Sequence, residues 1–251
     1  MSGLLIGILL SRMFSGIIGS ILGWQDVYRI AAAMMILLIL IFNLCFPKSV
    51  PNTVMSYRKL LKSLFVLLRT QPTLQETSLI GAMMFATFSA FWTTLSFFLK
   101  SPVYNLGAQT AGIFGLVGII GALAASVVGR IADKRNPRFT LSIAISISAL
   151  SYICFLFFGY QMWGLIIGVV LLDLGIQSGQ VSNQARINDL DATARNRNNA
   201  VYMTFYFCGG ALGSFLGTFF WGFWGWTGVC SIGIIFQIIA VIIHILGIKH
   251  G

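Results

Sequence analysis

A row of polar side chains interrupts one of the most apolar stretches of the chain. Asp173, Gln177, Gln180 and Gln184 are spaced 4, 3 and 4 residues apart. On an α-helix, which turns about 100° per residue, this spacing places all four within about 60° of one another. Exposing a carboxylate at the bilayer centre costs about 2.5–3.5 kcal/mol, so this face must point into a helix bundle or a water-filled cavity.

Two interpretations of Asp173 follow. In the first, the carboxylate lines a solute pathway and exchanges protons during transport, while the amides of the three glutamines accept cations, sugars or amphipaths. In the second, the carboxylate is structural and its hydrogen bonds hold helices together. The residues alone do not separate these alternatives.

The composition shows what surrounds this face. Of the 251 residues, 57% are hydrophobic and only 9% are charged, and the mean hydropathy is +0.89. The chain has too little polar surface for a water-soluble particle of this size, so its main solvent is lipid. Open sheet edges are not tolerated there, and alternating strand patterns are missing, which predicts an all-α integral membrane protein.

Eight apolar runs are each about as long as a helix needs to cross about 30 Å of hydrocarbon. They extend over Gly3 to Gly23, Val27 to Phe46, Ser78 to Leu99, Ala111 to Ile131, Leu141 to Gly159, Trp163 to Gln184, Val201 to Trp221 and Thr227 to Ile248. A polar, basic stretch at 47–77 separates the first two from the other six. We therefore expect eight transmembrane helices.

The basic residues predict the orientation. If residues 47–77 face the cytoplasm, all of the 16 Lys and Arg residues except Arg12, Arg29 and Lys100 lie inside. This asymmetry predicts that both termini are cytoplasmic. The formal net charge of +10 is then explained by topology and anionic lipid, and no nucleic-acid motif accompanies it.

The two ends of the chain share a repeat. Residues 7–43 align with 209–245 without gaps, and Gly23 and Trp24 match Gly225 and Trp226. A parallel repeat of this period implies two six-helix halves, as in a large class of secondary transporters. The second half is complete here, and the first contributes only its last two helices.

The segment "GRIADKRNPR" resembles the cytoplasmic G-x-(L/I)-A-D-(R/K)-x-G-R signature of the major facilitator superfamily. The matching positions are Gly129, Ile131, Asp133 and Lys134, and the final basic residue is displaced to Arg138. The resemblance implies a gating loop that latches the two halves together in one access state. The alternative is a basic loop that only sets the orientation.

The segment that begins "LDLGIQSGQVSNQARI" is similar to a bacterial branch of that family grouped with drug efflux proteins. This implies a major-facilitator-type fold with an incomplete first half. Residues 1–46 would be the last two helices of the N-terminal half, 47–77 the cytoplasmic linker with an amphipathic helix, and 78–251 the C-terminal six-helix half. It also implies a bacterial inner membrane location and a place for Asp173 on the tenth of twelve helices, beside the central pathway.

Other polar residues carry less information. Arg12 is a second intramembrane charge; it either pairs with Asp173 or serves a group on one of the missing helices. Ser89, Thr93 and Ser96 share one helix face and would line the pathway, unless their hydroxyls bond their own backbone. His244 is isolated in the sequence and carries little functional weight.

We predict a proton-coupled secondary transporter that exports a small solute by antiport. No enzymatic constellation is present in the sequence, and neither a cofactor nor a metal is expected. The rival prediction is a truncated, non-transporting remnant or an accessory membrane protein, because the first and fourth helices that would close the solute site from the other side are missing.

Overall fold

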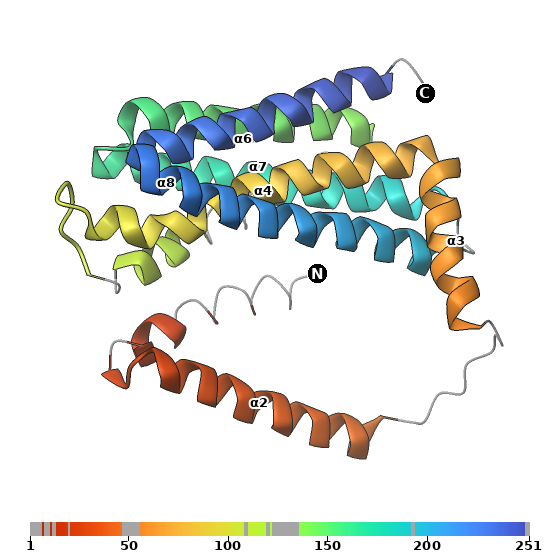
Figure 1. Cartoon of the computed structure of the whole chain (residues 1–251), viewed down its shortest axis with the longest axis horizontal. Coiled ribbons are helices and arrows are strands. Elements are labelled where there is room, and N and C mark those ends of the chain that lie inside the picture. The colour runs from red at the N-terminus through yellow and green to blue at the C-terminus, as the bar shows by residue number, and fades with distance from the viewer. Residues whose placement is uncertain are drawn as a thin grey trace.

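The fold was analysed in a computed structural model, which describes residues 7, 11, 14–19, 21–46, 56–107, 110–118, 121, 136–191 and 194–248. Its labelled helices are α2 (Trp24–Cys45), α3 (Tyr57–Thr70), α4 (Pro72–Lys100), α6 (Pro137–Phe158), α7 (Met162–Asn188) and α8 (Arg195–Ile248) (Figure 1). Residues 14–19 and 110–118 are also helical. The predicted all-α architecture is confirmed for this part of the chain.

Five of these helices are long and apolar enough to cross a membrane: α2, α4, α6, α7 and α8. The last of them contains two of the predicted spans, because its backbone leaves the helical region at Gly225, with φ 57° and ψ −140°. Only glycine adopts this conformation at low cost. Gly23, its partner in the sequence repeat, also has a positive φ, of 96°. Both Gly-Trp pairs therefore mark a turn between helices.

The bundle is organised around the contact between α4 and residues 195–224 of α8 (Figure 1). Gly209, Gly213 and Gly217 of α8 face Ala82, Ala86 and Ala90 of α4, in that order. A methyl group at Gly213 would overlap the Ala86 backbone. Small residues at every fourth position let the two backbones approach closely, which is how helices gain van der Waals contact in lipid.

A buried polar network connects α4, α6 and α8 between their ends. Gln237 of α8 donates from Nε2 to Thr87 Oγ1 at 3.1 Å, and its Oε1 accepts from Ser148 Oγ at 3.0 Å. Tyr152 Oη donates to the Thr87 carbonyl oxygen at 2.7 Å. All four side chains are 2% exposed or less. Because each is paired with a group on another helix, none of them costs a full desolvation penalty.

Stacked aromatic rings fill the core near the C-terminal end of α4. Trp226 stacks on Phe98 with ring centroids 4.0 Å apart, and its Nε1 donates to the carbonyl oxygen of Phe155 at 3.0 Å. Trp226 is only 3% exposed, whereas Trp24, its repeat partner, is 69% exposed. The tryptophan of the Gly-Trp pair is therefore buried within α8 and exposed at the start of α2.

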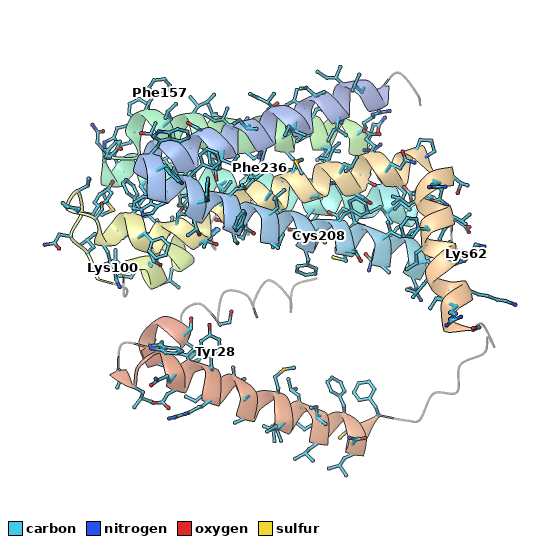
Figure 2. The ribbon with its side chains drawn as sticks, in the orientation of Figure 1. Tyr28, Lys62, Lys100, Phe157, Cys208 and Phe236 are labelled. Atoms are coloured by element: carbon cyan, nitrogen blue, oxygen red, sulfur yellow. The ribbon has the colours of Figure 1, made fainter. Side chains whose placement is uncertain are left out.

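The amphipathic helix α3 lies across one end of the bundle, which we call the α3 end (Figure 1). Leu64, Leu67 and Leu68 pack against Leu74 and its neighbours, while the basic residues of α3 are exposed. Lys62 lies at this end, and Tyr28 and Lys100 lie at the opposite end (Figure 2). Arg138 and Arg186 also lie at the α3 end, because α6 begins there and α7 ends there.

The helix α2 is the exception to this packing. Every residue of Trp24–Cys45 is described, and none of them is buried. From Ile30 to Phe42 every residue is apolar, so this part is apolar all round, as expected of a helix surrounded by lipid or by other apolar helices.

The α4–α8 contact yields a stability prediction. Gly213→Ala inserts a methyl group where the α4 backbone already lies, so we expect the free energy of unfolding to fall by about 1–3 kcal/mol. Unfolding of the purified chain in detergent measures this change.

Gly222→Ala is the matched control, because a Cβ at that position would meet nothing within 4 Å. Its stability should be unchanged or up to about 1 kcal/mol higher, since alanine favours a helix over glycine. Equal losses in the two variants would contradict the close contact between α4 and α8.

Candidate functional site

Asp173 lies on the face of α7 that contacts helical residues 110–118 and Gly121. The residue is 4% exposed. A Cβ added at Gly118 would lie 3.0 Å from Asp173 Oδ2, and one added at Gly121 would lie 2.9 Å from the Asp173 Cβ. The two glycines therefore leave the space that the carboxylate occupies. The carboxylate is turned away from lipid, as the cost of exposing it requires.

The three glutamines of the row continue along α7 toward the α3 end. Gln177, Gln180 and Gln184 are partly exposed. The Oε1 atom of Gln180 accepts from Tyr206 Oη of α8 at 3.4 Å. The row is thus buried at Asp173 and more open at its amides, which leaves amide groups able to bind a polar molecule.

A row of aromatic side chains on α4 begins beside Tyr206, the partner of Gln180. We call Phe85, Phe88 and Trp92 the aromatic row. Tyr206, which contacts Gln180, stacks on Phe85 with ring centroids 4.0 Å apart. Phe85 stacks on Phe88 at 5.8 Å, and Phe88 lies 6.0 Å from Trp92. The three rings are partly exposed, so flat apolar surfaces and amides occur side by side.

A cavity of about 290 Å³ lies at the far end of the aromatic row. It is lined by Ser15, Gly16, Trp92, Leu95, Ser96, Ala111 and Gly112. A Cβ at Gly16 would lie 3.6 Å from the Gly112 Cα, so the helices of these two glycines cross closely beside the cavity. The cavity therefore lies between helical residues 14–19 on one side and α4 with helical residues 110–118 on the other.

The predicted hydroxyl face of α4 is divided between two roles. Ser96 lines the cavity, whereas Thr93 Oγ1 donates to Ser214 Oγ of α8 at 2.9 Å. One hydroxyl is therefore available to a solute, and the other joins two helices.

Glu76 is the centre of an ion-pair cluster at the α3 end that the sequence analysis did not identify. Its Oε2 accepts from Arg186 Nη2 at 2.8 Å and from Arg138 Nη2 at 3.3 Å. His244 Nδ1 lies 3.5 Å from Oε1, and His244 Nε2 is bonded to Ser142 Oγ at 2.7 Å. We call Glu76, Arg138, Arg186 and His244 the Glu76 cluster. It joins α4, α6, α7 and α8.

The Glu76 cluster changes the interpretation of two residues. His244 is isolated in the sequence, but in the structure it lies beside Glu76 of α4. Residue spacing does not reveal a contact between two helices so far apart in the chain. Glu76 itself was assigned to the linker, yet it is 8% exposed inside α4. The available signal was a carboxylate one turn into an apolar helix, which is costly without a cationic partner.

Three wholly buried polar side chains adjoin this end of the bundle. Asn183 of α7 lies beside the Tyr202 hydroxyl of α8, and Asn198 is one helical turn before Tyr202. All three are 0% exposed. They were not predicted from the sequence, because their positions give no sign of which side of a helix faces the core.

Several predicted site residues lie outside the described residues. They are Arg12, Gly129, Asp133 and Lys134. Of the predicted gating loop, Arg138 is described, and its guanidinium pairs with Glu76. The pairing of Arg12 with Asp173 and the latching role of the loop stay predictions.

Long apolar helices with a buried acid define an all-α integral membrane protein, and comparison with known proteins identifies its family. The Major Facilitator Superfamily profile matches residues 1–190. The protein YgaY of Escherichia coli (strain K12), which is named as an uncharacterized transporter, is 36% identical over 233 residues, which are 93% of this chain and 59% of YgaY. A transporter of Streptomyces coelicolor is 29% identical over 92% of this chain and 54% of its own length.

The solved structures agree on the fold. The nucleoside transporter NupG superposes with a TM-score of 0.66 over 98% of this chain and 65% of NupG, at 17% identity. A peptide transporter of the POT family gives a TM-score of 0.60 over 71% of this chain and 37% of its own. The chain belongs to the Major Facilitator Superfamily. It spans somewhat more than half the length of the curated relatives that it matches.

The Glu76 cluster yields a second stability prediction. Glu76→Gln removes the charge that two guanidinium groups share, and loss of one partner of a buried ion pair costs about 3–5 kcal/mol. We expect a loss of about 3 kcal/mol, because the amide oxygen still accepts a hydrogen bond. Thermal or denaturant unfolding in detergent measures it.

Asp26→Asn is the matched control. Asp26 accepts from Arg29 Nη1 at 2.8 Å in a pair that is largely exposed, and such pairs contribute little to stability. If Glu76→Gln and Asp26→Asn lowered the free energy of unfolding equally, the Glu76 cluster would not stabilise the contact between its four helices.

Proposed function

We propose that this chain moves a small solute across a membrane as a secondary transporter, with proton exchange at Asp173. The observation that carries the proposal is the buried carboxylate at the end of a row of partly exposed amides. A transport pathway needs such groups inside an apolar bundle, where they are otherwise costly. Family membership and the transporter names of the relatives support the same function.

The site favours a solute with both polar and flat apolar surface. Gln177, Gln180 and Gln184 supply hydrogen-bond donors and acceptors, and the aromatic row supplies rings on which a solute can stack. The carboxylate would hold either a proton or a cationic group of the solute, so entry of one would favour release of the other. That competition is the basis of the proposed antiport.

The proposed cycle depends on two parts that move relative to each other. Residues 14–19 belong to the first part, and α4 with residues 110–118 to the second. The cavity at Ser15 and Ser96 lies between them, so rocking of the parts would open or close it. The loop of Gly129, Asp133 and Lys134 would latch one access state. Arg138 would anchor that loop to the six-helix part through Glu76.

The orientation proposed from the sequence fits this cycle. Exposed basic side chains of α3, together with Arg195 and Arg197, lie at the α3 end, and Lys100 lies at the other. A positive excess marks the cytoplasmic side of a membrane protein. We therefore place the α3 end and both termini in the cytoplasm, in a bacterial inner membrane.

A second candidate function is favoured by one observation. The apolar surface of α2 is exposed all round, which suits a helix that packs against another protein in the membrane. In that case the chain would be an accessory membrane protein or a non-transporting remnant. No solute would then drive proton movement through it.

Reconstitution separates the two candidates. The full chain is placed in proteoliposomes that contain a pH-sensitive dye, and cations, sugars, peptides and nucleosides are added in turn. We expect at least one solute to move protons. If none does so in either membrane orientation, the second candidate is favoured.

Asp173→Asn then tests the assigned residue. The amide cannot carry the proton, so we expect solute-driven proton flux to fall at least about a hundredfold, the lower end of the range typical of losing a positioned acid–base group. Asp189→Asn is the control, since Asp189 is an exposed carboxylate at the end of the same helix, and its flux should stay unchanged. Unchanged flux in Asp173→Asn would show that the proton is carried elsewhere.

A further inference from the structure

A second cavity of about 290 Å³ opens on the outside of the bundle at the α3 end. It lies between the start of α4, the start of α6 and the last turns of α8. One wall is polar and includes Thr73, Gln75 and Arg138, with Glu76 beside them. The other wall is apolar and includes Leu79, Ile243 and Leu246. This cavity has no residue in common with the proposed solute pathway.

The polar wall has an excess of positive charge. Glu76 is a single carboxylate shared by two guanidinium groups, so the three charged side chains sum to about +1 at neutral pH. The α4 helix begins at Pro72, beside the cavity, and its N-terminus adds positive partial charge. An anion in the cavity would therefore be attracted by Arg138 and by the helix end together.

Arg138 retains donors for such an anion. Its side-chain hydrogen bonds to Glu76 both leave from Nη2. Its Nε is buried and has no hydrogen-bond partner among the described residues. An anion in the cavity would therefore meet the terminal nitrogens of this side chain, which is 25% exposed. A guanidinium binds phosphate well, because its planar donors match two phosphate oxygens.

The apolar wall continues onto the lipid-facing surface of the bundle. Leu79 is 39% exposed and Leu246 is 54% exposed, and both belong to helices that cross the membrane. Gly247 completes the wall, and a Cβ there would lie 2.5 Å from Glu76 Cδ. A ligand that fills this cavity would therefore have an anionic group at Arg138 and an apolar chain along Leu79 and Leu246.

We propose that this cavity binds an anionic phospholipid, with the lipid phosphate at Arg138 and the start of an acyl chain against Leu79 and Leu246. Charge complementarity selects the anionic headgroup, and the apolar wall selects a lipid over a free anion. By neutralising the excess charge of the Glu76 cluster, the lipid stabilises the joint between α4, α6, α7 and α8. The proposal does not depend on the transport activity.

The test measures lipid binding to the full chain. Nanodiscs are prepared from phosphatidylcholine with increasing fractions of phosphatidylglycerol, and the unfolding temperature and the lipids retained in native mass spectrometry are recorded. We expect phosphatidylglycerol to raise the unfolding temperature. Arg138→Gln should bind it about tenfold more weakly, the effect of losing one charge-assisted hydrogen bond.

Two further variants make the test specific. Arg69→Gln removes an exposed positive charge from α3 at the same end and should leave the lipid effect unchanged. Leu246→Trp fills the apolar wall while every charge is kept, and it should also weaken binding. This variant decides the question if Arg138→Gln fails to fold.

Two results would overturn the proposal. If Arg138→Gln and Arg69→Gln reduce the phosphatidylglycerol effect equally, the lipid responds to general surface charge. If inorganic phosphate, added to the protein in pure phosphatidylcholine, raises the unfolding temperature as much as phosphatidylglycerol does, the cavity takes a free anion and not a lipid.

Discussion

The close approach of α4 to α8 is the contact on which the rest of the bundle depends. Lipid gives helices little hydrophobic reason to associate, so they are held by dense packing and by polar groups that need partners. Gly209, Gly213 and Gly217 allow the α8 backbone to lie directly on the alanines of α4. Because the two backbones lie so close, side chains that flank the contact also meet. Phe85 of α4 and Tyr206 of α8 are one such pair.

Polar side chains occur at successive depths of the bundle. Some are held by partners on other helices, and others are partly exposed. At the α3 end, Glu76 is held by two guanidinium groups and a histidine. Between the helix ends, Gln237 is held by groups on α4 and α6. Along α7, by contrast, the glutamines are partly exposed. The fixed groups hold α4, α6, α7 and α8 together, and the freer ones are those that we assign to the solute.

The two Gly-Trp turns show how one local signal serves two environments. Gly23 and Gly225 both have a positive φ, because a sharp change of direction between helices needs glycine. Trp226 then enters a stack with Phe98, whereas Trp24 stays exposed. The turn is a property of the local sequence. Whether the indole is buried depends on which helices surround it. No residue of α2 is buried, so Trp24 stays exposed.

Sequence by itself determined the features that depend on local chemistry. Composition and the length of the apolar runs predicted membrane helices. The described helices α2, α4, α6, α7 and α8 lie on these runs. The α4 helix begins at Pro72, ahead of the apolar run that starts at Ser78. The spacing of Asp173 and the glutamines determined that they share a face, because helical geometry is fixed.

Tertiary structure alone decided which distant residues meet. Glu76, Arg138, Arg186 and His244 come from four helices, and no spacing in the chain relates them. The aromatic row and Tyr206 lie beside the amides for the same reason. A helix fixes the direction of its own side chains, but the partner on the next helix depends on how the backbones cross. That crossing is set by small residues in contact, and it exists only in the folded bundle.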